Sequence, residues 1–223
     1  MTTSANLVTA LADLLPRTAI RTQRCPVNLQ LYALRQTWRS WAEKTEAWHQ
    51  TLTLDLVANQ LVYPLTYSNA EVEFRRVVAV WVRNAAEVAQ NLPGRELEPE
   101  QYNALLPSAA NAGAPSDNGT PQVVFCMAPA TTAVTGGLLV KVALIPWQNS
   151  QIDPPAAVLT YASDALVAGA LAELAGMSGK PWTNARMGED EGGKFARLCA
   201  QAKTDALRKG GSQTLSYRPS SFF

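Results

Sequence analysis

Apolar positions follow a helical period near both ends of the chain and a strand period in its middle. In residues 27–48, leucines and the tryptophans Trp38 and Trp41 recur near one stripe, with charged residues filling the rest of each turn. This spacing predicts an amphipathic helix. The apolar segment 4–15 predicts a shorter helix that Pro16 ends, because a proline in a helix interior removes a hydrogen bond and clashes with the preceding turn.

The middle of the chain has a period of two, which is typical of strands with one buried face. Residues 51–56 alternate cleanly, and residues 71–83 are dense in valine and aromatic side chains, so both segments predict strands. Three further strands are predicted at 61–65, 123–127 and 138–145. A short helix is predicted over 99–106, and loops are predicted over 107–120 and 135–137.

The last third of the chain predicts two helices joined by a tight corner. The first helix begins after Pro155, since a proline suits a helix start, and it ends at Gly176. Its apolar residues are mostly small, as at Gly169, so another helix can approach closely and burial is expected on more than one side. Pro181 and Trp182 form the corner, where Trp182 is expected to hold the two helices at a fixed angle.

The final residues, 212–223, have neither a helical nor a strand period. A segment of this kind is either disordered or an arm that folds onto a partner. The candidate docking side chains of this arm are Leu215, Tyr217, Arg218, Pro219, Phe222 and Phe223.

Together these elements predict an α+β fold. Residues 1–49 and 148–210 supply the N-terminal and C-terminal helices of a helical bundle. An antiparallel β domain over residues 50–147 is inserted between them, and an extended C-terminal arm follows over 211–223.

Composition and charge favour an oligomer. Charged residues make up 17% of the chain, below the usual ~25%, so more surface is expected to be covered than in a monomer. The formal net charge of +1 provides no basic field that would hold nucleic acid by counterion release. No apolar run is expected to approach the ~20 residues of a membrane span, and no signal peptide is evident, so the chain is expected to be cytosolic where it is made.

Side chains for catalysis or metal binding are sparse. His49 is the only histidine, and we interpret it as a polar residue at a helix end rather than as a catalytic base. Cys25, Cys126 and Cys199 are too far apart for a disulfide framework or a Cys-x-x-Cys metal site, so three reduced thiols that are buried or half-buried are expected. The segment Gly188–Lys194 resembles a phosphate loop superficially, but its three carboxylates favour a helix N-terminus, with a cation site left open. Neither enzymatic activity nor a cofactor is expected.

Two groups of side chains could contact nucleic acid. The tryptophans Trp38, Trp41 and Trp48 could stack on bases, but single-strand binders also need a basic groove, so core and subunit packing is preferred. The arginines 75, 76 and 83 could form a basic patch, but a solvated strand face is the preferred interpretation.

The order of the segments is similar to that of one family. An amphipathic helix with arginines and tryptophans precedes an alternating strand and a Tyr-Pro-Leu sequence; an alanine–leucine helix, a Lys-Pro-Trp corner, an amphipathic helix and an aromatic C-terminus follow. The matching segments span nearly the whole chain: Leu31–Trp48, Asp55–Leu65, Gly169–Leu174, Lys180–Asn184, Phe195–Arg208 and Tyr217–Pro219. This ordered set resembles the bacteriophage head-to-tail adaptor proteins, which are also called connector, head completion or tail tubular proteins.

The resemblance implies a structural virion protein at the head–tail junction, made in the host cytoplasm. A dodecameric ring of this protein would bind beneath the portal protein, extend the DNA channel and present a docking face for tail or nozzle proteins. Genomic double-stranded DNA would pass through without sequence-specific binding. The C-terminal arm would run along or between portal subunits.

Other classes stay open. A tail terminator or stopper would share the ring but cap the channel, with the loops at 107–120 and 129–137 as plug loops. A non-viral protein-binding module would stay monomeric and would not bind a portal. An enzyme is the third choice, and its activity would depend on His49.

Overall fold

The computed structural model describes residues 10–66, 71–105, 121–126, 130–148 and 150–210. Its fold is mixed α+β, which confirms the predicted class, and its paired strands are antiparallel. The helical elements are η1 (Ala12–Leu14), α1 (Leu15–Ala19), α2 (Val27–Thr45), α3 (Ala85–Ala89), η2 (Pro99–Gln101), α4 (Ala156–Gly176) and α5 (Ala185–Gly210). The strands are β1 (His49–Leu56), β2 (Val62–Pro64), β3 (Val72–Val82), β4 (Arg95–Glu96), β5 (Tyr102–Leu105), β6 (Gln122–Phe125) and β7 (Val134–Pro146).

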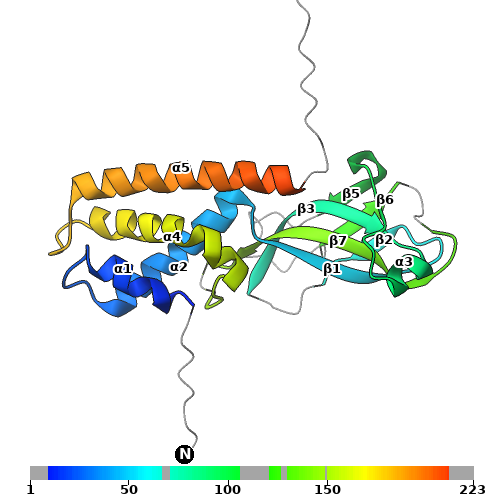
Figure 1. Ribbon diagram of the computed structural model, residues 1–223, viewed down its shortest axis with the longest axis horizontal. Coiled ribbons are helices and arrows are strands. Elements are labelled where there is room, and N and C mark those ends of the chain that lie inside the picture. Colours follow the sequence, from blue (N-terminus) through cyan, green and yellow to red (C-terminus); the bar gives the residue numbers. More distant parts are fainter. Residues whose placement is uncertain (1–9, 67–70, 106–120, 127–129, 149, 211–223) are drawn as a thin grey trace, which may run out of the picture.

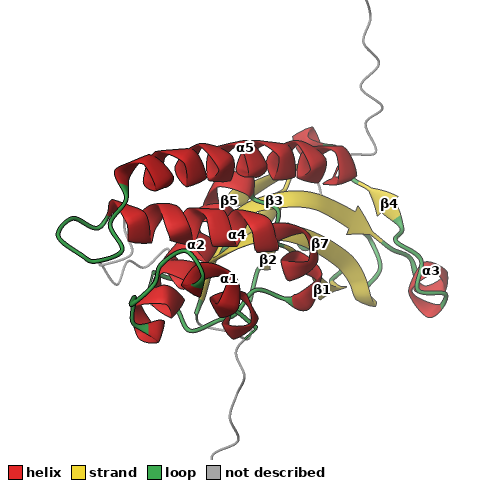
Figure 2. Ribbon diagram, turned by 60° about the vertical axis from the view of Figure 1, so that its left-hand side comes forward, coloured by secondary structure: helices red, strands yellow, loops and turns green. Residues whose placement is uncertain are grey.

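Long helices occupy one end of an elongated molecule and strands occupy the other (Figure 1). Helix α4 packs along α5 and also against α2, so it is enclosed by helices on two sides (Figure 2). The C-terminal end of α5 reaches the junction between the helices and the strands (Figure 1). This arrangement brings α2, α4, α5 and the start of β1 together at the junction.

The strands form two sheets. In the larger sheet, whose order is β1-β7-β3-β4, the long strand β7 pairs with β1 along one edge and with β3 along the other. Val140 of β7 lies opposite Leu52 and Val80, and is fully buried. The smaller sheet has the order β2-β6-β5. Residues 142–146 of β7 are all buried, so both faces of this part of the strand are covered, which explains its continuously apolar sequence.

The hydrophobic core runs without a break from the helices into the sheet. Trp38 stacks on Trp41 with ring centroids 5.6 Å apart, and its centroid lies 5.3 Å from that of Trp48. All three side chains are buried within one chain. Trp38 and Trp41 therefore pack in the core of the chain itself and have almost no surface left for the subunit packing that the sequence suggested.

Helix α2 ends earlier than the sequence predicts. It stops at Thr45, because Glu46 adopts a left-handed conformation with φ of 51° and terminates the hydrogen-bond ladder. The Glu46 carboxylate pairs with Arg76 at 2.9 Å, which ties this turn to β3. Trp48 consequently enters the core from the connection to β1 rather than from the helix.

The prediction for the N-terminal helix is wrong at Pro16. This proline lies in the first turn of α1, which continues to Ala19, so it starts a helix instead of ending one. The first turn of a helix tolerates proline because its N–H groups have no intrahelical partner there. The earlier part of the predicted helix, residues 4–9, lies outside the described residues.

Two predictions in the β region are also wrong. The helix expected over 99–106 is a single 3-10 turn followed by β5, because Tyr102–Leu105 pairs with β6. The loop expected at 135–137 belongs to β7, where the Gly136 N–H donates to the Asp55 carboxylate at 2.8 Å. Long-range strand pairing outweighs local turn propensity at both places.

Helix α4 is the one described helix that is long and apolar enough to cross a membrane, with a mean hydropathy of 1.3 over its most apolar window. The expectation that no apolar run approaches such a length is therefore wrong. Half of that window is buried inside the protein, and the core helices of globular proteins have the same composition. Packing against α2 and α5 explains the apolar sequence of α4.

Candidate functional site

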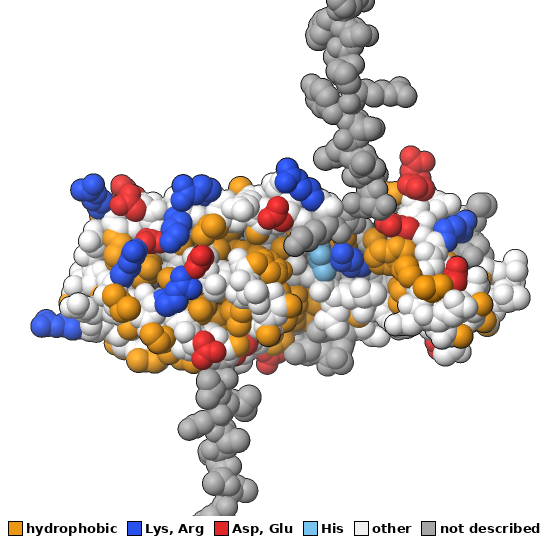
Figure 3. Space-filling model, in the orientation of Figure 1, with side chains coloured by type: hydrophobic (Ala, Val, Ile, Leu, Met, Phe, Trp, Pro, Cys, Tyr) orange, Lys and Arg blue, Asp and Glu red, His pale blue; other side chains and the backbone are white. Residues whose placement is uncertain are grey.

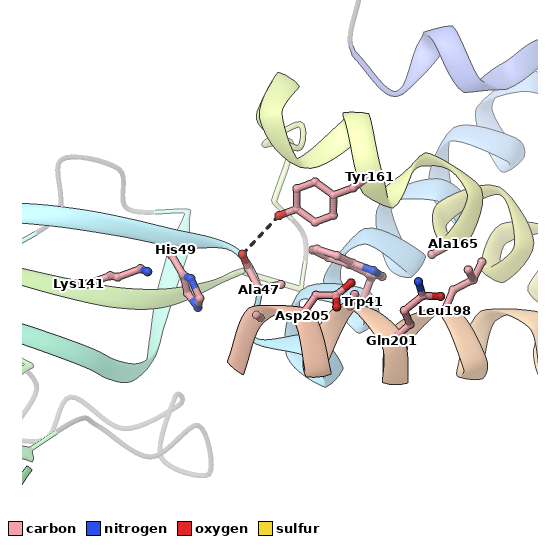
Figure 4. A pocket seen from close by; sticks show the side chains of 11 residues that line it. Trp41, Ala47, His49, Lys141, Tyr161, Ala165, Leu198, Gln201 and Asp205 are labelled. Carbon is pink, nitrogen blue, oxygen red and sulfur yellow. Dashed lines mark hydrogen bonds between the residues drawn. The ribbon is translucent and has the colours of Figure 1, made fainter. Parts of the chain in front are cut away.

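A groove with a volume of about 450 Å³ lies where the helical bundle meets the larger sheet (Figure 4). Helices α2, α4 and α5 supply one side, and β1, β7 and the connection before β1 supply the other. Its apolar lining consists mainly of Trp41, Ala47, Tyr161, Ala165, Leu198 and Ala202. Its polar lining consists of His49, Lys141, Gln201 and Asp205.

Two aromatic rings form the helical side of the groove. Trp41 is fully buried, and its ring centroid lies 5.8 Å from that of Tyr161, which is 55% exposed. The Tyr161 hydroxyl donates to the Ala47 carbonyl at 3.5 Å (Figure 4). Partial burial raises the pKa of Tyr161 above 10.0, so the hydroxyl stays protonated near neutral pH. An exposed aromatic ring beside a buried one provides a surface on which an apolar side chain can pack.

Charged and polar groups lie at the mouth of this apolar surface. Lys141 projects from β7, and Gln201 and Asp205 project from α5 (Figure 4). None of these three side chains makes a hydrogen bond or ion pair with any other described residue. The groove therefore combines an apolar floor with polar groups that are available to a ligand, which is the usual composition of a binding site.

His49 lies at the sheet side of the groove. Burial lowers its pKa below the ordinary 6.5, and the nearby positive charge of Lys141 and, less strongly, of Arg76 lowers it further. A hydrogen bond with the Glu46 backbone and the Glu46 carboxylate oppose the shift. The Nε2 atom is buried and has no partner among the described residues. The imidazole is therefore neutral at pH 7.

His49 should make stability depend on pH. Its pKa is lower in the folded chain than in the unfolded chain, so the unfolded state binds more protons as the pH falls below about 6.5. The free energy of unfolding should fall in that range, and the fall should be smaller in His49→Gln. Urea unfolding of both proteins at several pH values between about 5 and 7.5 measures the difference. If the free energy of unfolding changed with pH in the same way in both proteins, the lowered pKa of His49 would not be the cause.

The groove offers binding contacts rather than an assembled catalytic pair. No hydrogen bond joins His49 to a serine, threonine or cysteine side chain within the part of the chain that the structure describes. The described residues also contain no group of three or more histidine, cysteine, aspartate or glutamate side chains that could hold a metal ion.

Pro181 and Trp182 lie in the turn between α4 and α5, at the opposite end of the bundle from the groove (Figure 1). Gly179 takes φ of +72° in this turn, and the Asn184 side chain accepts from the Met187 N–H at 3.1 Å as α5 begins. Trp182 packs against the core, and its Nε1 is buried without a described partner. Together with Ile20, Pro181 and Trp182 line a second, smaller hollow of about 240 Å³.

The acidic segment Gly188–Lys194 lies inside α5, which begins at Ala185. Glu191 is buried and pairs with Arg21, and its other oxygen lies 4.0 Å from the Lys194 ammonium group. A Cβ at Gly188 would lie 3.6 Å from the Ala172 carbonyl, so this glycine lies directly against α4. The segment therefore serves helix packing and is no phosphate loop.

The arginines expected on a solvated strand face have specific partners. Arg83 is buried, and its guanidinium donates to the Gly136 carbonyl, with Nε at 3.1 Å. Arg75 and Arg76 both lie near the Glu46 carboxylate, at 3.9 Å and 2.9 Å. The interpretation that these arginines lie on a solvated strand face is therefore wrong for Arg83, which links the end of β3 to β7 through this hydrogen bond.

The three cysteines should differ sharply in reactivity. Cys25 and Cys199 are buried as expected, but Cys126 is exposed, so the expectation of burial is wrong for this residue. Burial raises the pKa of Cys199 to about 11 and also raises the pKa of Cys25, so few thiolates are present at neutral pH. We expect a maleimide to label one thiol per native chain quickly and the other two only after denaturant is added. Intact-mass spectrometry over time measures this, and Cys126→Ser is the control that should remove the fast label.

The predicted site residues fall into three groups. Trp41 lines the groove with Trp38 behind it in the core, while Pro181 and Trp182 lie at the other end of the bundle. The arm residues Leu215, Tyr217, Arg218, Pro219, Phe222 and Phe223 lie outside the described residues.

Sequence reasoning missed most of the groove. Tyr161, Lys141, Gln201 and Asp205 carry no motif, and only the fold brings them together. The one available signal was Tyr161, a large aromatic residue among the small side chains of its helix. No protein-family model matches the chain, and no curated protein is significantly similar to it.

Proposed function

We propose that this protein is a bacteriophage head-to-tail adaptor. In this role it forms a ring beneath a portal protein, extends the DNA channel and offers a docking face to tail proteins. One structural observation carries the proposal: large apolar side chains are exposed on both halves of the molecule. The sequence segments occur in the same order as in the adaptor family, and this resemblance suggests which assembly the protein joins.

The exposed apolar residues belong to the helices, to the strands and to the connections between them. On the helical half they are Ile20, Val27, Tyr32, Tyr161 and Leu207. On the β half they are Val57, Leu61, Val62, Leu92 and Trp147. Hydrophobic side chains gather over the helical half and continue to the junction (Figure 3). The apolar patch that gathers over the helical half is the kind of surface that proteins bury against other subunits.

The charge distribution suits a DNA conduit. Several arginines are already paired with carboxylates, as in Arg17–Asp164 at 2.5 Å, Arg76–Glu46 at 2.9 Å and Arg39–Glu73 at 4.0 Å. With a formal net charge of +1, the chain has no large excess of positive charge for phosphates. DNA would therefore pass such a ring without the strong, salt-dependent attachment of a DNA-binding protein.

The direct test is assembly with the portal protein of the same genome. Light scattering and negative-stain imaging are made on the purified chain alone, on the portal alone and on the mixture. We expect the mixture to form a complex with an added ring of density on one face of the portal. A chain that stays monomeric and does not bind that portal would overturn the proposal.

The C-terminal arm should be necessary for this assembly. A chain cut after Gly211 keeps every described residue and should still fold, but it should no longer join the portal. Circular dichroism checks the fold, and co-sedimentation with the portal measures binding. The matched control keeps the arm and changes three of its polar residues, Ser212, Ser216 and Ser220, to alanine; it should bind normally. Normal binding by the truncated chain would refute the role of the arm.

A further inference from the structure

We infer that, in the free protein, the groove at the junction is the docking site of the chain's own C-terminal segment, residues 212–223. This inference does not rest on the adaptor proposal, because it concerns one chain in the absence of any portal. Three observations support it: the place where α5 ends, the lining of the groove, and the charged groups at its mouth.

The described chain ends beside the groove. Asp205 and Ala206 line the groove, and α5 continues only to Gly210, about 6 Å further along the helix axis at 1.5 Å per residue. Twelve further residues can span at most about 40 Å. Gly210 and Gly211 together allow the chain to reverse direction after the helix. The segment can therefore reach every part of the groove while α5 remains intact.

The chemistry of the segment matches that of the groove. The groove has a floor of aromatic and aliphatic side chains, and its volume of about 450 Å³ is within the ~300–1,000 Å³ typical of ligand pockets. Residues 212–223 contain four large apolar side chains, Leu215, Tyr217, Phe222 and Phe223. An aromatic side chain from this segment can pack on the exposed Tyr161 ring beside the buried Trp41.

The charges are complementary as well. Arg218 is the only charged side chain in residues 212–223. The exposed Asp205 carboxylate has no ion pair or hydrogen bond with another described residue, and it lies at the mouth of the groove (Figure 4). Lys141 and Gln201 offer donors to the Tyr217 hydroxyl and to backbone carbonyls of the segment.

Covalent attachment favours this occupant over a separate molecule. A segment joined to the groove by a short flexible linker has an effective concentration in the millimolar range. A free partner would need a much higher affinity, or a comparable concentration, to displace it. Docking in the same chain also covers apolar groove surface in the free protein, where no neighbouring subunit does so.

The nuclear magnetic resonance signal of His49, the single histidine, reports whether the groove is occupied, because His49 lines it. The intact chain is compared with the variant Tyr217→Ser/Phe222→Ser/Phe223→Ser, and with the matched control Ser212→Ala/Ser216→Ala/Ser220→Ala. We expect the imidazole signal to shift in the first variant only, and to return when a synthetic peptide of residues 212–223 is added. Identical signals in all three proteins would overturn the inference, as would a shift that appears only when portal protein is added.

Disulfide trapping distinguishes the same chain from a second copy. In a Cys126→Ser background, Arg218→Cys is combined with Asp205→Cys, or with Lys203→Cys as a control on the same helix outside the groove lining. The Asp205 pair should oxidise about tenfold faster than the Lys203 pair and give an intramolecular bond. Equal rates would refute docking in the groove. A predominantly disulfide-linked dimer would show that the segment of a second copy occupies it.

Discussion

Replacing Trp38 with alanine should lower the free energy of unfolding by about 3–5 kcal/mol, as is usual for a large aromatic side chain removed from a core. Trp38 is 1% exposed and packs against both Trp41 and Trp48, so its loss leaves a cavity that the stacked neighbours cannot fill without moving. Its Nε1 has no described partner, so the loss of packing dominates the expected change. Urea unfolding followed by circular dichroism measures the change.

Trp147→Ala is the matched control. Trp147 is 39% exposed, and its Nε1 donates to the Val72 carbonyl at 3.1 Å. Its replacement should cost about 1 kcal/mol, mainly from that hydrogen bond and from partial burial. Similar losses in the two variants would mean that the tryptophan cluster does not have the central place in the core that the burial of Trp38 indicates.

The same tryptophans show what the sequence could predict. Periodic spacing of Trp38 and Trp41 identified α2 and its buried face, because a helix that buries one face must repeat its apolar positions every three to four residues. Alternation identified β1 for the corresponding reason in strands, and the density of valine and aromatic side chains identified β3. These signals are local, so one segment contains all the information that its prediction needs.

Predictions failed where a distant partner decides the conformation. Tyr102–Leu105 becomes a strand because β6 lies beside it, and Gly136 joins β7 because Asp55 accepts its N–H. Thr45 ends α2 because Glu46 takes a left-handed conformation and pairs with Arg76. None of these contacts has a signature in the neighbouring residues.

The groove was beyond local prediction for the same reason. Its lining comes from α2, β1, β7, α4 and α5, and residues from the two halves of the chain meet only after folding. His49 was recognised as a polar residue next to a helix end, but the groove that it lines is completed by Tyr161 and by residues of α5, which are far from it in the sequence. Lys141 and Asp205 have the appearance of ordinary surface charges in the sequence.

Close helix packing at Gly169 leads to the second large expected effect. Gly169→Ala should destabilise the protein by about 1–3 kcal/mol, although alanine is the better helix former. A Cβ at this position would lie 2.3 Å from the Thr37 Cγ2 of α2 and 3.0 Å from the Phe195 ring of α5. Both neighbours are buried, so α2 or α5 must move to accommodate the methyl group.

Two further variants isolate the cause. Gly193→Ala lies in α5 with no heavy atom within 4 Å of its new Cβ, so it should stabilise the protein by about 0.5–1 kcal/mol. Thr37→Ser removes the clashing methyl group and keeps the hydroxyl, so the double variant with Gly169→Ala should recover part of the loss. Thermal or urea unfolding of the wild type, Gly169→Ala, Thr37→Ser and the double variant gives the coupling energy between the two positions, expected at about 0.5–3 kcal/mol. Additive effects would mean that α4 does not pack against α2 as closely at Gly169 as the structure indicates. Strong coupling would establish that the small residues of α4 set the spacing of the bundle, and thereby the width of the groove that α2, α4 and α5 enclose.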